Sequence, residues 1–169
     1  MTRPQSTEAA KDYFKYIDLI TSDDIVPTIE NQMGEMLEFL SGISEEQSLH
    51  SYEPGKWTIR EVLNHVNDGE RVFSGRAFWF ARGFTDALPS FDQEVAARMA
   101  HANKTSWAEL VEEFKNVRLG TISFFKSMPE EAWARTGVAS DNLVSVRALA
   151  YIIAGHVAHH TRVLREKYV

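Results

Sequence analysis

The chain has 169 residues, of which 44% are hydrophobic and 25% are charged, and this length and composition predict a single domain spanning residues 1–169. Its formal net charge of -6 argues against nucleic acid as a partner, because proteins that contact phosphates normally carry a basic face. The chain has no cysteine, which excludes disulfides, thiolate metal ligands and a cysteine nucleophile.

The first third of the chain shows two segments with apolar residues at helical spacing. We expect a short helix around residues 8–20 and a long one over residues 24–40, ended by Ser41 and Gly42. The stretch "SEEQSLHSYEPGKW" is expected to form a loop, with room for one helical turn, because Pro54-Gly55 cannot continue a helix.

The next long helix is expected over residues 58–81. Thr58 and Glu61 are three residues apart and can form a capping box at its start. After Gly83 the chain enters a long connection to Thr105, with a weaker helical piece around residues 93–100. A connection of this length is compatible both with a crossover and with a lid over a pocket.

Two more helices complete the pattern. Ser106 and Glu109 offer a second capping box for a helix over residues 107–126, and Pro129 ends that region. A short helical turn and a loop should follow before a last helix over residues 144–167. Four long amphipathic helices without strand-like alternation predict an all-α four-helix bundle, with a short extra N-terminal helix and ligand sites between facing helices.

The same segments bear on location. No apolar run approaches the roughly 20 residues of a membrane-spanning helix, and the first residues lack the apolar core of a signal peptide. We therefore expect a cytoplasmic protein that has neither membrane nor nucleic acid as a partner.

Histidines interrupt the apolar stripe of the last helix. The stripe has spacings of four, three, four and three residues and consists of Leu149, Ile153, His156, His160 and Val163. Two histidines thus stand where leucines are expected, one turn apart on one face, where two imidazoles of one helix can bind one ion. His159 lies off this line and is expected to support the site, face solvent or contact a neighbouring chain.

A third histidine lies on a similar line of the helix over residues 58–81. This line runs through Val62, His65, Gly69, Val72 and Arg76. Gly69 costs roughly 1 kcal/mol of helix propensity relative to alanine, which indicates that close approach or a cavity beside His65 is needed there. Arg76 is suited either to an anionic substrate or to an ion pair with a glutamate.

Three neutral imidazoles from two helices would leave coordination positions open, as catalytic zinc sites do, and would suit a divalent Zn or Ni ion. The alternative is that the histidines are hydrogen-bonded core residues. Asp68 and Glu70 are candidates for orienting His65 or a bound water and for acting as general base, or else belong to a solvated helix face.

Two segments carry a family resemblance. "KWTIREVLNHVNDGE" (56–70) resembles the tryptophan-to-glutamate segment of the DinB-like, or YfiT-like, superfamily of DNA-damage-inducible proteins and candidate metalloenzymes. "GHVAHHTRVL" (155–164) is similar to the last core helix of that superfamily. Arg162 and Val163 depart from the family pattern, because they stand where a glycine and a glutamine are frequent.

The resemblance implies a four-helix bundle, often a homodimer, with nickel or zinc held by His65, His156 and His160. It also implies a small-molecule substrate, with low-molecular-weight thiols such as bacillithiol or mycothiol as partners. The leading hypothesis is thus a metal-dependent enzyme that activates a thiol or water, as a thiol S-transferase or a hydrolase. The alternative is a non-catalytic dimer that binds metal or a small molecule in a stress response.

Overall fold

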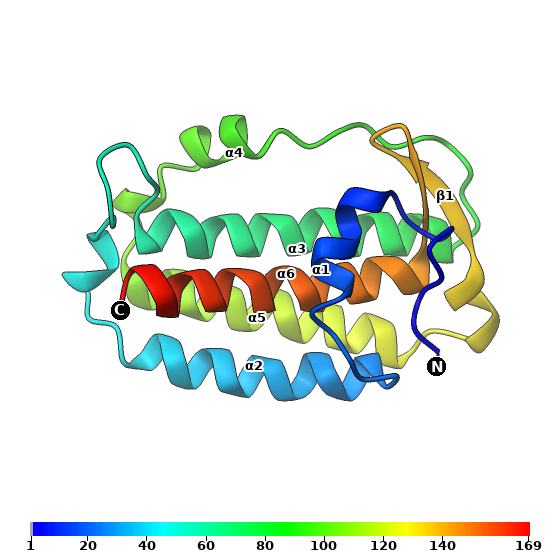
Figure 1. Ribbon diagram of the computed structural model, residues 1–169, viewed down its shortest axis with the longest axis horizontal. Coiled ribbons are helices and arrows are strands. Elements are labelled where there is room, and N and C mark those ends of the chain that lie inside the picture. Colours follow the sequence, from blue (N-terminus) through cyan, green and yellow to red (C-terminus); the bar gives the residue numbers. More distant parts are fainter. Residues whose placement is uncertain (1) are drawn as a thin grey trace.

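The computed structural model describes residues 2–169 and is dominated by four long helices (Figure 1). These are α2 (Ile25–Ser41), α3 (Ile59–Ala81), α5 (Trp107–Lys126) and α6 (Val146–Lys167). They lie side by side along the long axis of the molecule and enclose its apolar core. The prediction of an all-α four-helix bundle is confirmed.

Shorter elements surround the bundle. Helix α1 (Phe14–Ile17) crosses α6, helix α4 (Gln93–Ala100) lies beyond α3, and the strands β1 (Thr136–Ala139) and β2 (Asn142–Ser145) form a hairpin at one end. Short 3₁₀ turns occupy Lys11–Tyr13, Gln47–Leu49, Ala102–Lys104 and Glu130–Ala134. Within residues 2–169, no helix is both long enough and apolar enough to cross a membrane.

The connections between the helices determine which of them are neighbours. Helices α2 and α3 each pack mainly against α5 and α6, so α2 and α3 occupy diagonally opposite corners of the bundle, as do α5 and α6. The chain connections from α2 to α3 and from α5 to α6 therefore cross the bundle diagonally. The connection between α3 and α5 runs back along the whole bundle, which makes these two helices parallel (Figure 1). The long segment after Gly83 is therefore a crossover.

The expected helix starts are present. The Thr58 hydroxyl accepts a hydrogen bond from the Glu61 backbone N–H, and the Glu61 carboxylate accepts one from the Thr58 backbone N–H. Ser106 and Glu109 form the same reciprocal arrangement at the start of α5. Each capping box satisfies two N–H groups that would otherwise lack a partner, which fixes where the helix begins.

Two sequence predictions about the ends of the bundle were wrong. The region before α6 was expected to lack strands, yet it forms the hairpin, and Val144 belongs to β2 rather than to the last helix. The turn residues Ser140 and Asp141 both have positive φ, at 51° and 61°, without the Asn-Gly or Gly-rich pair that marks such turns in sequence. The N-terminal helix is also shorter than expected, with four residues in α1.

Close backbone packing holds α1 on α6. A Cβ added to Gly155 would lie 2.1 Å from the Tyr16 carbonyl oxygen, which a rigid backbone cannot accommodate. We expect Gly155→Ala to lower the free energy of unfolding by about 1–3 kcal/mol and to increase hydrogen exchange in α1. Gly34→Ala in α2 is the control, since no atom would contact its added methyl within 4 Å. Unchanged exchange in Gly155→Ala would contradict this packing.

Candidate metal centre

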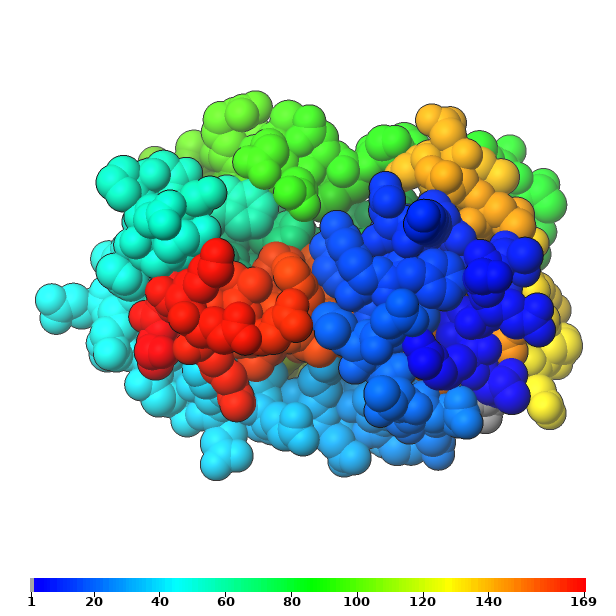
Figure 2. Space-filling view, in the orientation of Figure 1, coloured from blue at the N-terminus to red at the C-terminus, as the bar shows by residue number. Residues whose placement is uncertain are grey.

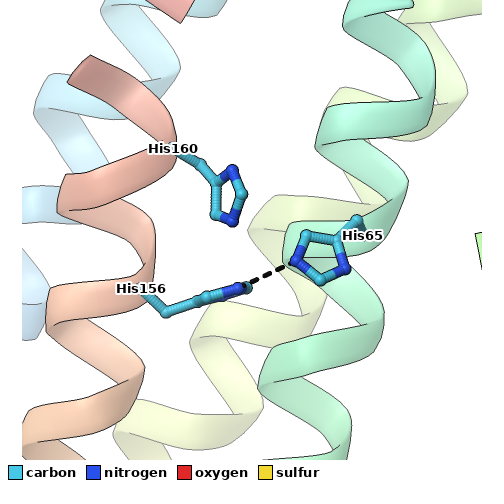
Figure 3. Close-up of side chains that lie close together, drawn as sticks. All are labelled: His65, His156 and His160. Carbon is cyan, nitrogen blue, oxygen red and sulfur yellow. Dashed lines mark hydrogen bonds between the residues drawn. The ribbon is translucent and has the colours of Figure 1, made fainter. Parts of the chain in front are cut away.

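Three histidine rings meet between α3 and α6. His65 projects from α3, and His156 and His160 project from successive turns of α6 toward it (Figure 3). The ring centroids of His65 lie 4.8 Å from those of His156 and His160, and the latter two are 4.5 Å apart. One nitrogen of each ring lies within 4.8 Å of the other two. The structure thus brings together the three residues that the sequence singled out.

The donor set fits a divalent ion. The Nε2 atoms of His65 and His156 are 3.0 Å apart, and nitrogens that share one ion at about 2.0–2.1 Å are separated by about this distance. The Nε2 atom of His160 is buried and has no hydrogen-bond partner among residues 2–169, although buried polar atoms are rarely left unpaired. An ion between the three rings would provide that partner.

Burial keeps the three imidazoles in the uncharged form that binds metal. Burial, with a smaller effect of His159, lowers the pKa of His65 to about 4. The pKa of His160 is lowered to about 3, mainly by burial and to a smaller extent by the neighbouring His65, His159 and Lys15. The pKa of His156 is well below its usual range, mainly through burial. Neutral rings at neutral pH do not need to lose a proton before they coordinate.

These pKa values predict the pH dependence of the metal-free protein. An unfolded histidine titrates near 6.5, so between pH 6.5 and about 4 the unfolded chain binds protons that the native site excludes. These groups therefore leave the free energy of unfolding unchanged above pH 6.5 and lower it as the pH falls below 6.5, down to about 4 for His65 and about 3 for His160. Urea denaturation of chelator-treated protein at pH 7 and pH 5 should show it, and His160→Leu should reduce the loss. An equal loss in His160→Leu and wild type would contradict the assignment.

Gly69 makes room for one of the rings. It lies one turn after His65 on α3, and a Cβ built on it would be 2.8 Å from Cε1 and 3.2 Å from Nδ1 of His156. The close approach expected from the sequence is therefore made by a ring of α6. A cavity of about 510 Å³ also begins at this point, with His65, Gly69 and His156 in its wall.

The rest of that cavity is formed by segments outside the four long helices. The N-terminal segment contributes Tyr13 and Tyr16, the crossover contributes Phe91, and the hairpin contributes Ser140. Figure 2 shows a hollow on this face between the N-terminal segment, the crossover with α4 and the hairpin. The crossover thus also serves as a wall over the cavity.

The two candidate carboxylates lie elsewhere. Asp68 accepts a hydrogen bond from Asn64 and pairs with Arg71, and burial raises its pKa. Glu70 is 2% exposed and forms an ion pair with the fully buried Arg118 of α5, with 2.9 Å between Oε2 and Nη2. In the part of the chain that the structure describes, neither carboxylate bonds to a ring or lines the cavity. Glu70, five residues after His65, points about 140° away from the His65 direction. Asp68, three residues after it, lies only about 60° off that direction, but Asn64 and Arg71 engage its carboxylate.

Other residues near the centre shape its surroundings. Trp57 precedes the start of α3, and its ring centroid lies 5.0 Å from that of His65. Its ring therefore covers the site. The Tyr16 ring contacts His156 edge-on at 5.3 Å and His159 at 5.5 Å. Sequence reasoning did not find Tyr16, because nothing in its local pattern places α1 over α6. Arg162, at the family's glycine position, lines a separate surface hollow.

Comparison with known proteins agrees with the resemblance seen in the two motif segments. The sequence profile of the DinB superfamily matches residues 28–164. The chain belongs to the DinB superfamily. A relative from Oceanobacillus iheyensis, named as a candidate metal-dependent hydrolase, is 24% identical in an alignment of length 151 that covers 83% of this chain and 83% of the relative.

Solved structures share the fold of this DinB-superfamily chain. YfiT from Bacillus subtilis, described as a candidate metal-dependent hydrolase with an unusual four-helix bundle topology, aligns with a TM-score of 0.65 and 13% identity over 96% of this chain and 91% of its own. The mycothiol-dependent maleylpyruvate isomerase aligns with a TM-score of 0.70 and 12% identity, over 86% of this chain and 61% of the isomerase.

Proposed function

We propose that the chain is a metal-dependent enzyme in which His65, His156 and His160 hold a zinc or nickel ion that activates a thiol or a water molecule. The observation that carries this proposal is the meeting of three imidazoles from two helices, two of them in the wall of a cavity and the third with a buried nitrogen that has no hydrogen-bond partner among residues 2–169. A divalent ion held there would act as a Lewis acid and lower the pKa of the group it activates.

The chain's own residues supply positioning and exclusion of water. The Gly69 backbone and the Tyr16 ring contact His156 from two sides and limit its rotation. Trp57 covers His65, and the N-terminal segment and the crossover wall the cavity. A reaction between a small molecule and an activated thiol or water is favoured beside the buried His65 and His156, because electrostatic effects are stronger where water has little access.

The test is elemental analysis of protein purified without an affinity tag and without added metal. We expect close to one zinc or nickel ion per chain in the wild type and a loss of that ion in His65→Ala, His156→Ala and His160→Ala. His101→Ala is the matched control, because His101 lies after α4 and outside the cluster. Metal far below one per chain that added zinc or nickel cannot restore would overturn the proposal.

The reaction proposed is thiol S-transfer or hydrolysis. Names given to relatives support both choices, since one solved relative uses mycothiol and others are named as candidate metal-dependent hydrolases. We place the activity in the cytoplasm, where small thiols are kept reduced. Metal-loaded protein should be screened with low-molecular-weight thiols paired with electrophiles, and with esters and amides. Consumption of thiol that requires His156 would identify a transferase.

A homodimer is also proposed, on the resemblance together with an exposed apolar surface of α3 and α5. Phe78 is 44% exposed, and Phe124 of α5 lies beside it with ring centroids 6.2 Å apart. Sedimentation of wild type and of Phe78→Ser tests this assignment. A wild-type protein that sediments as a monomer at micromolar concentration would remove it.

The alternative function is a non-catalytic dimer that binds metal or a small molecule in a stress response. The scarcity of carboxylates at the rings favours it, because neither Asp68 nor Glu70 stands where a general base would act on a group bound there. Stoichiometric metal and ligand binding, without turnover of any thiol, ester or amide tested, would support this alternative.

A further inference from the structure

Arg76 lies at the end of the cavity far from the histidines. The residue is only 6% exposed. Its Nη2 donates hydrogen bonds to the Pro89 carbonyl oxygen at 2.8 Å and to the Ser140 hydroxyl at 3.0 Å. No carboxylate of residues 2–169 lies within 4.0 Å of its guanidinium. Arginine is rarely buried without an anionic partner.

The backbone around Arg76 is fixed by two segments that meet there. Leu88 of the crossover donates its N–H to the Val138 carbonyl, and Ser140 donates its N–H to the Leu88 carbonyl, at 2.9 and 3.1 Å. Ser140 has a positive φ of 51°, which is uncommon for a residue other than glycine and recurs at ligand sites. The guanidinium is therefore held by the wall of the cavity, and its other donor nitrogens make no hydrogen bond to residues 2–169.

Apolar and charged side chains line the rest of the cavity, and the charged ones are Lys11, Asp12 and Lys15. Val72, Phe73 and Tyr13 line the cavity between the two ends, and the Tyr13 and Phe73 rings pack edge-on at 6.0 Å. Gly69 faces His156, and Arg76 follows seven residues later, which is about 10 Å along the axis of α3. A ligand that reaches both ends must therefore be elongated.

We propose that the cavity takes an elongated organic molecule whose reacting group lies at the histidines and whose far end is a carboxylate bound by Arg76. One buried guanidinium beside a hydroxyl suits a singly charged anion, which the donors of Arg76 not engaged by Pro89 or Ser140 can hold by charge-assisted hydrogen bonds. This inference rests on the proposed function for the identity of the reacting end. The carboxylate end stands on Arg76, its surroundings and the lining of the cavity.

The probes are thiols of matched length with different ends. Calorimetry on zinc-loaded protein should compare ω-mercaptooctanoate with ω-mercaptooctanol, and with the short mercaptopropionate, whose carboxylate cannot reach Arg76. The chain has no cysteine, so these thiols form no mixed disulfides with it. We expect mercaptooctanoate to bind about tenfold or more tightly than either of the other two, which corresponds to one charge-assisted contact at the far end.

Variants assign the difference to one residue. Arg76→Gln should remove the preference for mercaptooctanoate over mercaptooctanol, whereas Arg82→Gln, which removes the same charge from an exposed position at the end of α3, should keep it. Gln93→Glu is a second variant, placed on the exposed rim of the same cavity, in case Arg76 is needed for folding. Its added negative charge should weaken mercaptooctanoate and leave mercaptooctanol unchanged.

The outcomes separate this inference from the metal proposal. Octanoate binding to metal-free protein that depends on Arg76 would support the carboxylate end even if no metal binds. Equal affinity of the acid and the alcohol for wild-type protein would overturn the inference while leaving the metal centre intact. A preference for the acid that survives in Arg76→Gln, or that falls equally in Arg82→Gln, would also overturn it, because other cations, such as Lys11 and Lys15 of the cavity lining, would then be the cause.

Discussion

Replacing Gly69 with alanine is expected to lower the affinity for zinc by about tenfold to a hundredfold, the range seen when the support of a metal-bound histidine is removed. The added methyl would lie 2.8 Å from Cε1 of His156, inside normal contact distance. The ring must then rotate or α3 must move away from α6, and either change separates its nitrogen from those of His65 and His160. Competition with a chromogenic chelator measures the affinity.

Gly75→Ala is the control for this variant. Gly75 lies in the same helix, so both substitutions raise helix propensity by roughly the same 1 kcal/mol. They differ in their surroundings, because the methyl added at Gly75 would meet nothing within 4 Å. Gly75→Ala should bind zinc as the wild type does, and both variants should keep their helical circular dichroism. Wild-type affinity in Gly69→Ala would show that His156 is free to move and does not need this packing.

Breaking the ion pair between Glu70 and Arg118 is expected to cost about 3–5 kcal/mol of unfolding free energy. The two side chains are 2% and 0% exposed, so Arg118→Met leaves a carboxylate in the core without its partner. Burial raises the pKa of Glu70, and the Arg118 guanidinium opposes that rise. Urea denaturation at pH 7 measures the change, with Lys115→Met, which breaks an exposed pair with Glu112, as a control expected to change stability by less than about 1 kcal/mol.

The double variant Glu70→Leu with Arg118→Met should recover most of that loss. Replacing both members of a buried pair with apolar side chains removes the cost of burying charge, and Glu70 Oε1 and Arg118 Nε already lack hydrogen-bond partners within the described chain. A double variant no more stable than Arg118→Met would indicate that the pair is needed for the helices to pack. Zinc affinity should be unchanged, because the pair lies on the α5 side of α3.

The long helices and the histidine cluster could be predicted from the sequence because their signals are local. Thr58 and Ser106 each belong to a capping box of four consecutive residues that marks the start of a helix. Helices α4 and α5 begin and end where expected. Helical periodicity alone placed His156 and His160 on the inward face. The same periodicity placed His65 on the inward line of its helix, the family resemblance implied the same three ligands, and the structure brings the three rings together.

The remaining features depend on tertiary contacts that local patterns do not encode. Glu70 could be assigned to a site or to solvent, but its partner Arg118 is 48 positions away, and no short-range signal links the two. The hairpin has only four residues in each strand and an unusual turn at Ser140 and Asp141. The placement of Tyr16 over His156 depends on the close approach of two backbones at Gly155. These contacts build the cavity, so its shape was the least predictable part of the site.

All three histidines come from only two helices, which pack in opposite directions against each other. Sliding α3 past α6 by a single residue, about 1.5 Å, would part His65 from the other two rings. The affinity for a metal held by these three rings would therefore depend on the alignment of the two helices along their axes. A core substitution that lets α3 and α6 shift would weaken metal binding before any helix unfolds. The affinity for the ion would thus measure how well the whole bundle is packed.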